Sequence, residues 1–205
     1  MIHVEKIISF NFDQNCYLVY DENKNGFLVD PGFDTLKILK KIEELNVNAG
    51  YILLTHCHYD HIFSVSELRG HKKLVCGEKC SENIGSLGMN LSAGIGSPFT
   101  VAPADIIVSD ESEFIIGDMK IRCIASPGHT DCGFCYMVED MLFSGDTLFL
   151  RNVGRWDLPS GDENTLKKSI REKLFSLPDN TRVLCGHGGD TTIGYEKKYN
   201  FYVGA

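Results

Sequence analysis

The chain contains no apolar run that approaches the roughly 18–20 residues needed to cross a lipid bilayer. Its first residues, 1–6, lack the order of basic and then apolar residues that marks a secretory signal. Its eight cysteines lack the spacing of a disulfide scaffold, which indicates reduced thiols. These absences predict a cytoplasmic protein with no membrane partner.

Positive charge is also scarce, because 20 Lys and Arg residues face 28 Asp and Glu residues and leave a net charge of −8. A protein that binds a phosphate backbone usually presents a basic face, so the composition argues against a nucleic-acid partner. No linker, repeat or low-complexity tract divides the 205 residues. We therefore expect a single domain covering residues 1–205, whose oligomeric state the sequence leaves open.

Short apolar runs alternate with a few segments of helical periodicity. The runs that predict strands cover residues 3–10, 15–20, 26–30, 50–55, 72–76, 113–117, 119–125, 133–138, 141–145 and 182–186. Helical patterns cover residues 34–45, about 60–69, 162–176 and 194–199. The Gly-, Ser- and Pro-rich segment 81–104 predicts a loop or short helix beside a site. Two series of strands, each followed by helices, predict an α+β fold of two sheets packed face to face with helices outside.

Three histidines and an aspartate crowd into the sequence Thr-His-Cys-His-Tyr-Asp-His at residues 55–61. This segment follows a strand-like apolar run at residues 51–54, so it lies where a buried strand ends. Imidazole and carboxylate together suit Zn(II), Fe(II) or Mn(II). Burying four such groups without a cation would cost roughly 1–3 kcal/mol for each unpaired group, so a metal site is favoured over a solvated polar loop.

Three further motifs have the same placement. Ser-Pro-Gly-His-Thr at 126–130, Phe-Ser-Gly-Asp-Thr at 143–147 and Leu-Cys-Gly-His-Gly at 184–188 each lie at the end of a predicted strand. Loops gathered at one edge of a rigid sandwich can converge on one point. The pattern therefore adds His129, Asp146 and His187 to the candidate ligands.

In this order, the four motifs resemble the metallo-β-lactamase fold superfamily, and within it the glyoxalase II-like (hydroxyacylglutathione hydrolase-like) branch. The resemblance covers essentially the whole chain, from the Val-Asp-Pro-Gly turn at 29–32 onward. It implies a four-layer αβ/βα sandwich with two mixed sheets.

The resemblance also implies a ligand set for two divalent metal ions, with zinc ahead of iron or manganese. The first ion would be held by His56, His58 and His129, the second by Asp60, His61 and His187, and Asp146 would bridge the two. Two such ions roughly 3.5–4 Å apart give hydroxide at neutral pH and polarise a carbonyl. Asp60 could act as a catalytic residue that accepts a hydrogen bond from this hydroxide. Asp30 either supports a ligand histidine or only forms a turn.

Part of the chain departs from the pattern of the glutathione-thioester hydrolases it resembles. Gly-Arg-Trp-Asp at 154–157 replaces their usual Gly-Lys-x-Tyr, and the chain stops about ten residues after Tyr195 without their C-terminal helical segment. Arg155 could bind a substrate carboxylate through its planar guanidinium, or it could form a loop salt bridge. The thiol carrier of the substrate therefore stays open.

These features predict a metal-dependent hydrolase that cleaves a small thioester by a metal-bridging hydroxide, with other esters as further substrates. The main alternative is a persulfide dioxygenase, an iron oxidoreductase whose members share Thr-His-Cys-His-x-Asp-His and Gly-Arg-x-Asp. Such an enzyme would use one Fe(II) on His56, His129 and Asp146. A metal-dependent nuclease shares the seven ligands but generally needs an RNA-binding arm or basic patch, and neither is visible in the sequence.

Overall fold

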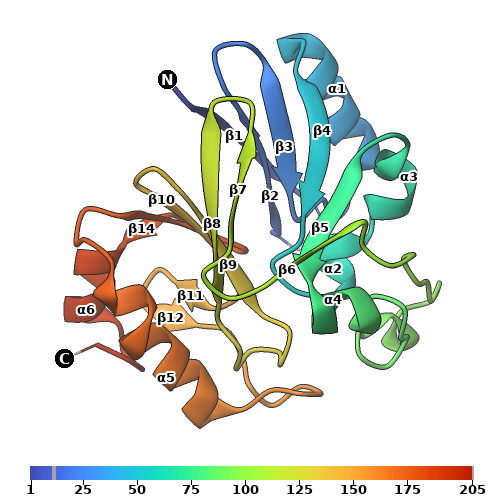
Figure 1. Cartoon of the computed structure of the whole chain (residues 1–205). Helices are drawn as coiled ribbons and strands as arrows, with labels where there is room; N and C mark the ends of the chain where they lie inside the picture. The colour runs from blue at the N-terminus through green and yellow to red at the C-terminus, as the bar shows by residue number, and fades with distance from the viewer. Residues whose placement is uncertain (11–12, 205) are drawn as a thin grey trace.

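The computed structural model describes residues 1–10 and 13–204, in which two six-stranded sheets form the centre (Figure 1). In the first sheet the strands follow one another in chain order. They are β1 (His3–Ile8), β2 (Asn15–Tyr20), β3 (Asn25–Val29), β4 (Asn48–Leu53), β5 (Lys73–Gly77) and β6 (Ile106–Val108). The pairs from β1 to β3 are antiparallel and those from β3 to β6 are parallel, so this sheet is mixed.

The second sheet has the order β14-β13-β10-β9-β8-β7. Its strands are β7 (Glu113–Ile116), β8 (Met119–Ala125), β9 (Phe134–Val138), β10 (Met141–Gly145), β13 (Arg182–Cys185) and β14 (Thr191–Thr192). Its parallel pair joins β10 to β13, and its other pairs are antiparallel. A small hairpin of β11 (Leu148–Phe149) and β12 (Asn152–Val153) follows β10.

Apolar side chains from both sheets fill the space between them. Tyr17 and Phe27 of the first sheet meet Phe143 of the second in edge-to-face contacts, with ring centroids 5.4 and 6.4 Å apart. Along β8, Met119 and Ile121 are buried in this core while Lys120 faces outward, as the two-residue period of a strand requires. Burying each large apolar side chain contributes about 1.5–3 kcal/mol.

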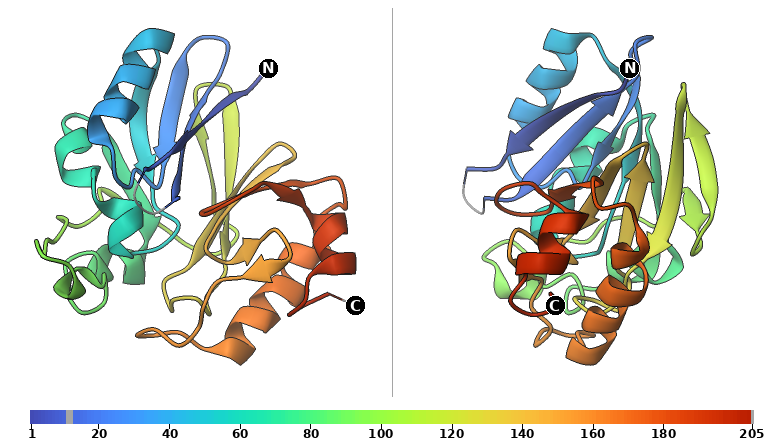
Figure 2. Two further views of the ribbon diagram at one scale, coloured as in Figure 1. Left: turned by 180° about the vertical axis from the view of Figure 1, so that it is seen from behind. Right: turned by 90° about the vertical axis from the view of Figure 1, so that its left-hand side faces the viewer.

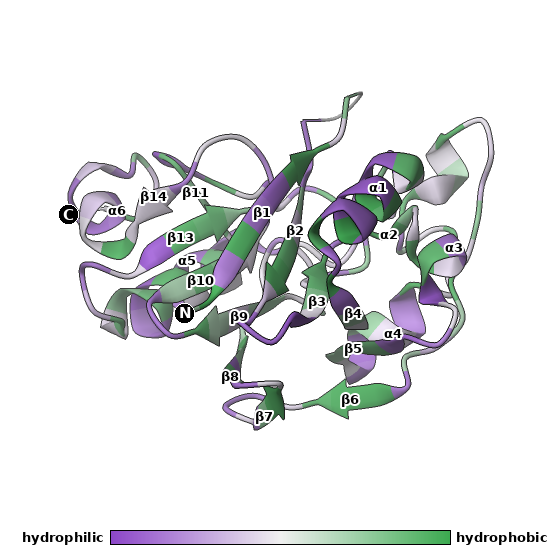
Figure 3. Cartoon of the chain, turned by 90° about the horizontal axis from the view of Figure 1, so that it is seen from above, coloured by the Kyte–Doolittle hydropathy of each residue, from purple (hydrophilic) through white to green (hydrophobic). Residues whose placement is uncertain are grey.

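Helices cover the two outer faces, so the chain forms four layers (Figure 2). The helices α1 (Thr35–Leu45), α3 (Val65–Arg69) and α4 (Glu78–Asn83) lie on the first sheet. The helices α5 (Glu163–Glu172) and α6 (Ile193–Tyr199) lie on the second. Figure 3 shows hydrophilic and hydrophobic residues interleaved along α1, as expected for a helix with one buried face. The predicted α+β sandwich of two mixed sheets with outer helices is confirmed.

Local sequence explains the limits of the helices. At the start of α5, the side chain of Asp162 accepts a hydrogen bond from the backbone N–H of Thr165 at 2.7 Å, a helix cap. The helix predicted at 60–69 is wrong as one element, because α2 (Tyr59–Ile62) and α3 are separate. They part at Ser64, whose backbone N–H donates to the carbonyls of Pro31 and Gly32 rather than within a continuous helix.

Some short elements were not predicted. They are β6, β11, β12 and β14, each of two or three residues, and α4, which begins before the segment expected to be a loop. Within the segment 81–104, residues Ser92–Gly94 form a 3-10 turn, as expected for a loop with a short helix. Among the described residues, no helix is both long and apolar enough to span a membrane.

Candidate metal centre

All four predicted motifs converge at one edge of the sandwich, where β4, β8, β10 and β13 end. The segment 55–61 follows β4 and runs into α2, while His129, Asp146 and His187 follow β8, β10 and β13. The structure therefore brings together the seven predicted ligands, which span 132 positions of the sequence from His56 to His187.

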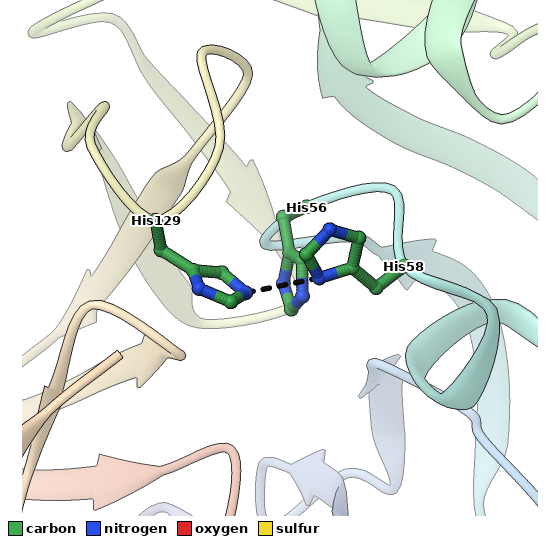
Figure 4. Close-up of side chains that lie close together, drawn as sticks. All are labelled: His56, His58 and His129. Carbon is green, nitrogen blue, oxygen red and sulfur yellow. Dashed lines mark hydrogen bonds between the residues drawn. The ribbon is translucent and has the colours of Figure 1, made fainter. Parts of the chain in front are cut away.

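The first cluster consists of His56, His58 and His129, whose ligand atoms lie within 4.8 Å of one another. Figure 4 shows the three imidazoles turned toward one another from two separate loops. The Nε2 of His129 lies 2.9 Å from the Nδ1 of His58. All three side chains are buried, with at most 5% of each residue exposed.

Hydrogen bonds on the far side of two rings set which nitrogen faces the cluster. The Nδ1 of His129 lies 2.7 Å from the backbone carbonyl of Arg155, which can only accept, so Nδ1 carries the proton. The Nδ1 of His56 lies 3.0 Å from the hydroxyl of Thr55, which itself donates to Asp30 at 2.6 Å. In both rings the lone pair is therefore on Nε2, the nitrogen that a metal ion would use.

The second cluster consists of Asp60, His61 and His187, which also lie within 4.8 Å by their ligand atoms. The Nε2 of His187 lies 3.3 Å from both the Nε2 of His61 and the Oδ2 of Asp60. Behind His61, the carboxylate of Asp30 lies 3.0 Å from Nδ1 and so turns Nε2 toward the cluster. Asp30 therefore supports the candidate ligand His61, which was one of the two expectations for it.

Asp146 lies between the two clusters. Its Oδ1 is 3.3 Å from the Nε2 of His61, and its Oδ2 is 3.6 Å from the Nε2 of both His129 and His187. One carboxylate thus faces nitrogens of both clusters, which is the placement that a bridging ligand needs.

The nitrogen and oxygen atoms of the two clusters are better suited to bind divalent metal ions than to form hydrogen bonds with one another. Among the described residues, the buried Nε2 of His56 has no hydrogen-bond partner, and the buried Oδ1 of Asp146 has only its ion-pair contact with His61. A buried polar atom without a partner costs about 1–3 kcal/mol, and a cation would remove that cost for His56. Nitrogen and carboxylate oxygen donors in this number suit zinc, iron and manganese alike.

The charges of the centre also favour a cation. Burial would raise the pKa of Asp146, but the facing His61 holds it well below its ordinary value. Burial and His61 oppose each other in the same way at Asp60, whose pKa is lowered. Burial alone would lower the pKa of His61, yet Asp146 and Asp60 raise it well above its ordinary value. The two carboxylates therefore stay ionised and draw positive charge to the point between the clusters.

A sequence profile of the metallo-beta-lactamase superfamily matches residues 10–187. The chain belongs to the metallo-beta-lactamase superfamily. Among curated proteins, hydroxyacylglutathione hydrolase GloC from Haemophilus influenzae is 34% identical over 97% of this chain and 97% of its own length. The resemblance predicted from the motifs is confirmed.

Solved structures show the same fold. The crystal structure of BLEG-1 B3 metallo-beta-lactamase has a TM-score of 0.94 at 33% identity and covers 100% of both chains. ETHE1 from Myxococcus xanthus has a TM-score of 0.83 at 28% identity, covering 98% of this chain and 84% of its own. TTHA1623, solved in a di-iron-bound form, has a TM-score of 0.84 at 28% identity and covers 97% and 100%.

In this superfamily member, two glycines make room for the centre. A Cβ at Gly186 would lie 2.2 Å from Oδ1 of Asp146, and one at Gly154 would lie 1.9 Å from the backbone carbonyl of Asp146. Both distances are far below van der Waals contact, so larger residues there would displace Asp146. The glycines beside the ligand motifs are thus explained by close packing.

A pocket of about 450 Å³ opens onto the centre. Five of the candidate ligands form its floor, and its walls carry apolar side chains from several loops: Tyr59, Leu91, Phe149, Val153 and Leu158. The sequence did not single out these wall residues, although Leu91 belongs to the segment 81–104 that was expected to lie beside the site.

Arg155 stands at the mouth of this pocket. Its Nε and Nη2 donate to the two carboxylate oxygens of Asp157 at 2.8 and 2.7 Å, so the loop salt bridge considered for it is present. Its side chain nevertheless stays 62% exposed, and its backbone carbonyl orients His129. The carbonyl contact was not predicted, because a backbone atom leaves no signature in the residue type.

Proposed function

We propose that the protein is a hydrolase that binds two divalent metal ions and cleaves small thioesters, with other acyl esters as further substrates. The observation that carries the proposal is the pair of three-residue clusters on either side of Asp146 at the floor of a pocket. Zinc is the proposed resident ion, ahead of iron or manganese.

Two divalent ions held by these clusters would supply hydroxide at neutral pH and polarise the thioester carbonyl. The chain's own groups have separate tasks. The ionised carboxylate of Asp60 can accept a hydrogen bond from the attacking group and aim it. The apolar walls, including Tyr59 and Phe149, exclude water from the acyl group and fit a small molecule.

The composition and the cysteines support the remaining parts of the proposal. All eight cysteines are free and buried, which supports a reducing compartment such as the cytoplasm. The net charge of −8 and the pocket of about 450 Å³ over the candidate metal centre favour a small-molecule partner over nucleic acid. The hydroxyacylglutathione hydrolase GloC supports a thioester as the substrate class.

Metal content and reaction type should be measured together. We expect two metal ions per chain by elemental analysis, and zinc-loaded protein that hydrolyses thioesters in a panel of thioesters, esters, lactones, β-lactams and persulfides. Protein loaded with iron or manganese serves as the comparison. One iron per chain together with oxygen consumption on a persulfide would overturn the proposal in favour of the dioxygenase on His56, His129 and Asp146.

Arg155 should contribute to substrate binding rather than to the chemical step. Replacing Arg155 with alanine should raise KM for carboxylate-bearing thioesters about tenfold, because one charge-assisted contact of about 1.4 kcal/mol is lost. The kcat and metal content should stay unchanged, the signature of lost uniform binding.

Arg151 provides the matched control for this prediction. Its guanidinium lies over the ring of Phe201 at 4.6 Å from the centroid, and it does not line the pocket. Arg151→Ala should therefore leave KM within about twofold. If KM increased equally in the two variants, the effect of Arg155 would come from the overall charge of the protein and not from a direct contact with the substrate.

A further inference from the structure

The loop that carries His187 has little rigidity of its own. His187 lies between Gly186 and Gly188, and Gly188 has a φ of 71°, in the left-handed region that favours glycine. With 29% of its side chain exposed, His187 is also the most exposed of the seven candidate ligands. Packing around its ring is therefore incomplete, so the direction of the ring depends on what fixes the backbone on either side.

Asn15, the first residue of β2, contacts this backbone on both sides of His187. Its backbone N–H donates to the carbonyl of Gly186 at 2.7 Å. Its side-chain Nδ2 donates to the carbonyls of Cys185 and Gly188 at 2.9 and 3.0 Å. The residue is 1% exposed, so water does not compete for these bonds. Asn15 thus joins the first sheet to the loop after β13 and spans the position of His187.

An amide is the group that these contacts require. Backbone carbonyls only accept hydrogen bonds, so the atom that faces two of them must be the N–H₂ of Asn15 and not its oxygen. Among the described residues, the buried Oδ1 of Asn15 has no hydrogen-bond partner, which is unfavourable. The two N–H donors are therefore the contribution of this side chain, and an aspartate or leucine of similar size has neither.

The two carbonyls that the Asn15 side chain binds also accept from other side chains. The hydroxyl of Tyr17 donates to the carbonyl of Cys185 at 2.7 Å, and the Nζ of Lys6 donates to that of Gly188 at 3.2 Å. Each of these donors reaches one side of the loop only, whereas the amide of Asn15 links both sides. Removing the amide would therefore loosen the loop without leaving either carbonyl unpartnered.

The residue before Asn15 supports the other histidine of the same cluster. The Nε2 of Gln14 donates to the backbone carbonyl of Asp30 at 2.9 Å, and the carboxylate of Asp30 lies 3.0 Å from the Nδ1 of His61. The backbone of Gln14 also pairs with that of His187. Two consecutive amide side chains at the start of β2 thus contact the supports of both histidines of the second cluster.

The first cluster has different supports. The backbone carbonyl of Arg155 orients His129, and the hydroxyl of Thr55 contacts His56. The amide of Asn15 instead reaches the loop after β13. A change at Asn15 should therefore affect the second cluster and not the first.

We propose that Asn15 is a positioning residue for the second metal ion, an inference that rests on the two-ion centre of the proposed function and not on its reaction. Asn15 acts through the backbone beside His187 and contributes no ligand atom. Its amide fixes the carbonyls on both sides of the loop in one arrangement. The imidazole of His187 can then meet the ion with little further loss of conformational freedom.

Zinc titration of chelator-treated protein tests this role without any reaction. Competition with a zinc indicator gives the Kd of each ion in wild type and in Asn15→Ala. We expect the Kd of one ion to rise about 10- to 100-fold, the usual effect of losing a group that orients a ligand, and the Kd of the other to change by less than about twofold. Asn15→Leu fills the space without N–H donors and should give the same pattern, also where the cavity left by alanine destabilises the fold.

Removing His187 shows whether Asn15 acts through it. In the His187→Ala background, adding Asn15→Ala should change the Kd of the remaining ion by less than about twofold, because the ligand that Asn15 positions is already absent. A residue that only stabilises the fold would weaken the binding of that ion further. Such additional weakening would overturn the inference, and so would an equal rise of both Kd values in the single variant.

Asn90 is the matched control. It is 0% exposed, and its Nδ2 donates to the carbonyls of Ile84 and Phe99 at 3.2 and 3.0 Å, so its bonds resemble those of Asn15 but lie within the segment 84–99. Asn90→Ala should lower stability and leave both Kd values within about twofold of wild type.

The proposed function fails separately. Wild-type protein that binds a single zinc ion defeats the two-ion centre, and the Kd of that ion in Asn15→Ala still decides the role of Asn15. Two ions bound equally well by wild type and Asn15→Ala defeat only the role of Asn15.

Discussion

Replacing Asp146 with alanine is expected to remove at least one of the two metal ions and to reduce thioester turnover about a thousandfold or more. The reason is the position of this carboxylate, whose Oδ1 and Oδ2 face His61 of one cluster and His129 of the other. Without it, two dications would repel each other with less compensating charge. Elemental analysis of the purified variant and steady-state kinetics would measure both effects.

Two further variants test whether the charge of Asp146 matters and whether the neighbouring Cys57 is a ligand. Asp146→Asn keeps the volume of the side chain and should still lose the metal, because a neutral amide cannot offset two cations. Cys57→Ser should keep the metal: Cys57 lies between two ligand histidines in the sequence, but its Sγ points to the carbonyl of Met89 at 3.5 Å. Loss of metal in Cys57→Ser with retention in Asp146→Ala would show that the ligand assignment is wrong.

The fold was predictable because most strands show a clear pattern of apolar residues in the sequence. The strand β8, for example, buries Met119 and Ile121 and exposes Lys120, so its period is evident from the residues alone. The edge strand β6 has only three residues, and two of them, Ile106 and Ile107, are 39% and 51% exposed. A strand that short, with apolar residues facing outward, cannot be recognised from periodicity.

The convergence of the candidate ligands was predictable because these residues lie in compact motifs at the ends of strands. Asp30 shows the limit of this reasoning. Its backbone has a φ of 47°, as a turn residue can, but its carboxylate also contacts His61, so Asp30 does more than form a turn. Whether a turn aspartate also binds a histidine depends on the neighbouring strand, which the local sequence does not contain.

The contact between Trp156 and Tyr202 was not predictable, for a related physical reason. Tyr202 lies 46 positions after Trp156, and they meet because Asn200 and Glu196 fasten the tail to the hairpin of β11 and β12. Such polar contacts between distant segments have no periodic signature.

Replacing Asp30, which contacts Thr55 and the candidate ligand His61, should also have a large effect on stability and metal affinity. Asp30 is 1% exposed, and its carboxylate accepts from the backbone N–H of Thr55 at 2.7 Å, from the Thr55 hydroxyl at 2.6 Å and from His61 Nδ1 at 3.0 Å. Asp30→Asn places an amide N–H₂ against groups that donate. We expect a loss of about 3 kcal/mol in the free energy of unfolding and metal affinity reduced about 10- to 100-fold.

Asp21 is the matched control, because it is 2% exposed and accepts from the backbone N–H groups of Asn25 and Asp118, each at 2.9 Å. It lies beyond the end of β2 that is opposite Asn15, the residue beside Gly186, and a six-residue strand separates them by about 20 Å. Asp21→Asn should therefore lose stability without losing metal affinity. Urea unfolding of chelator-treated protein measures the first quantity, and competition with a metal indicator measures the second. If both variants weakened metal binding equally, the hydrogen bonds of Asp30 would matter only for the fold, and the orientation of His61 would not depend on them.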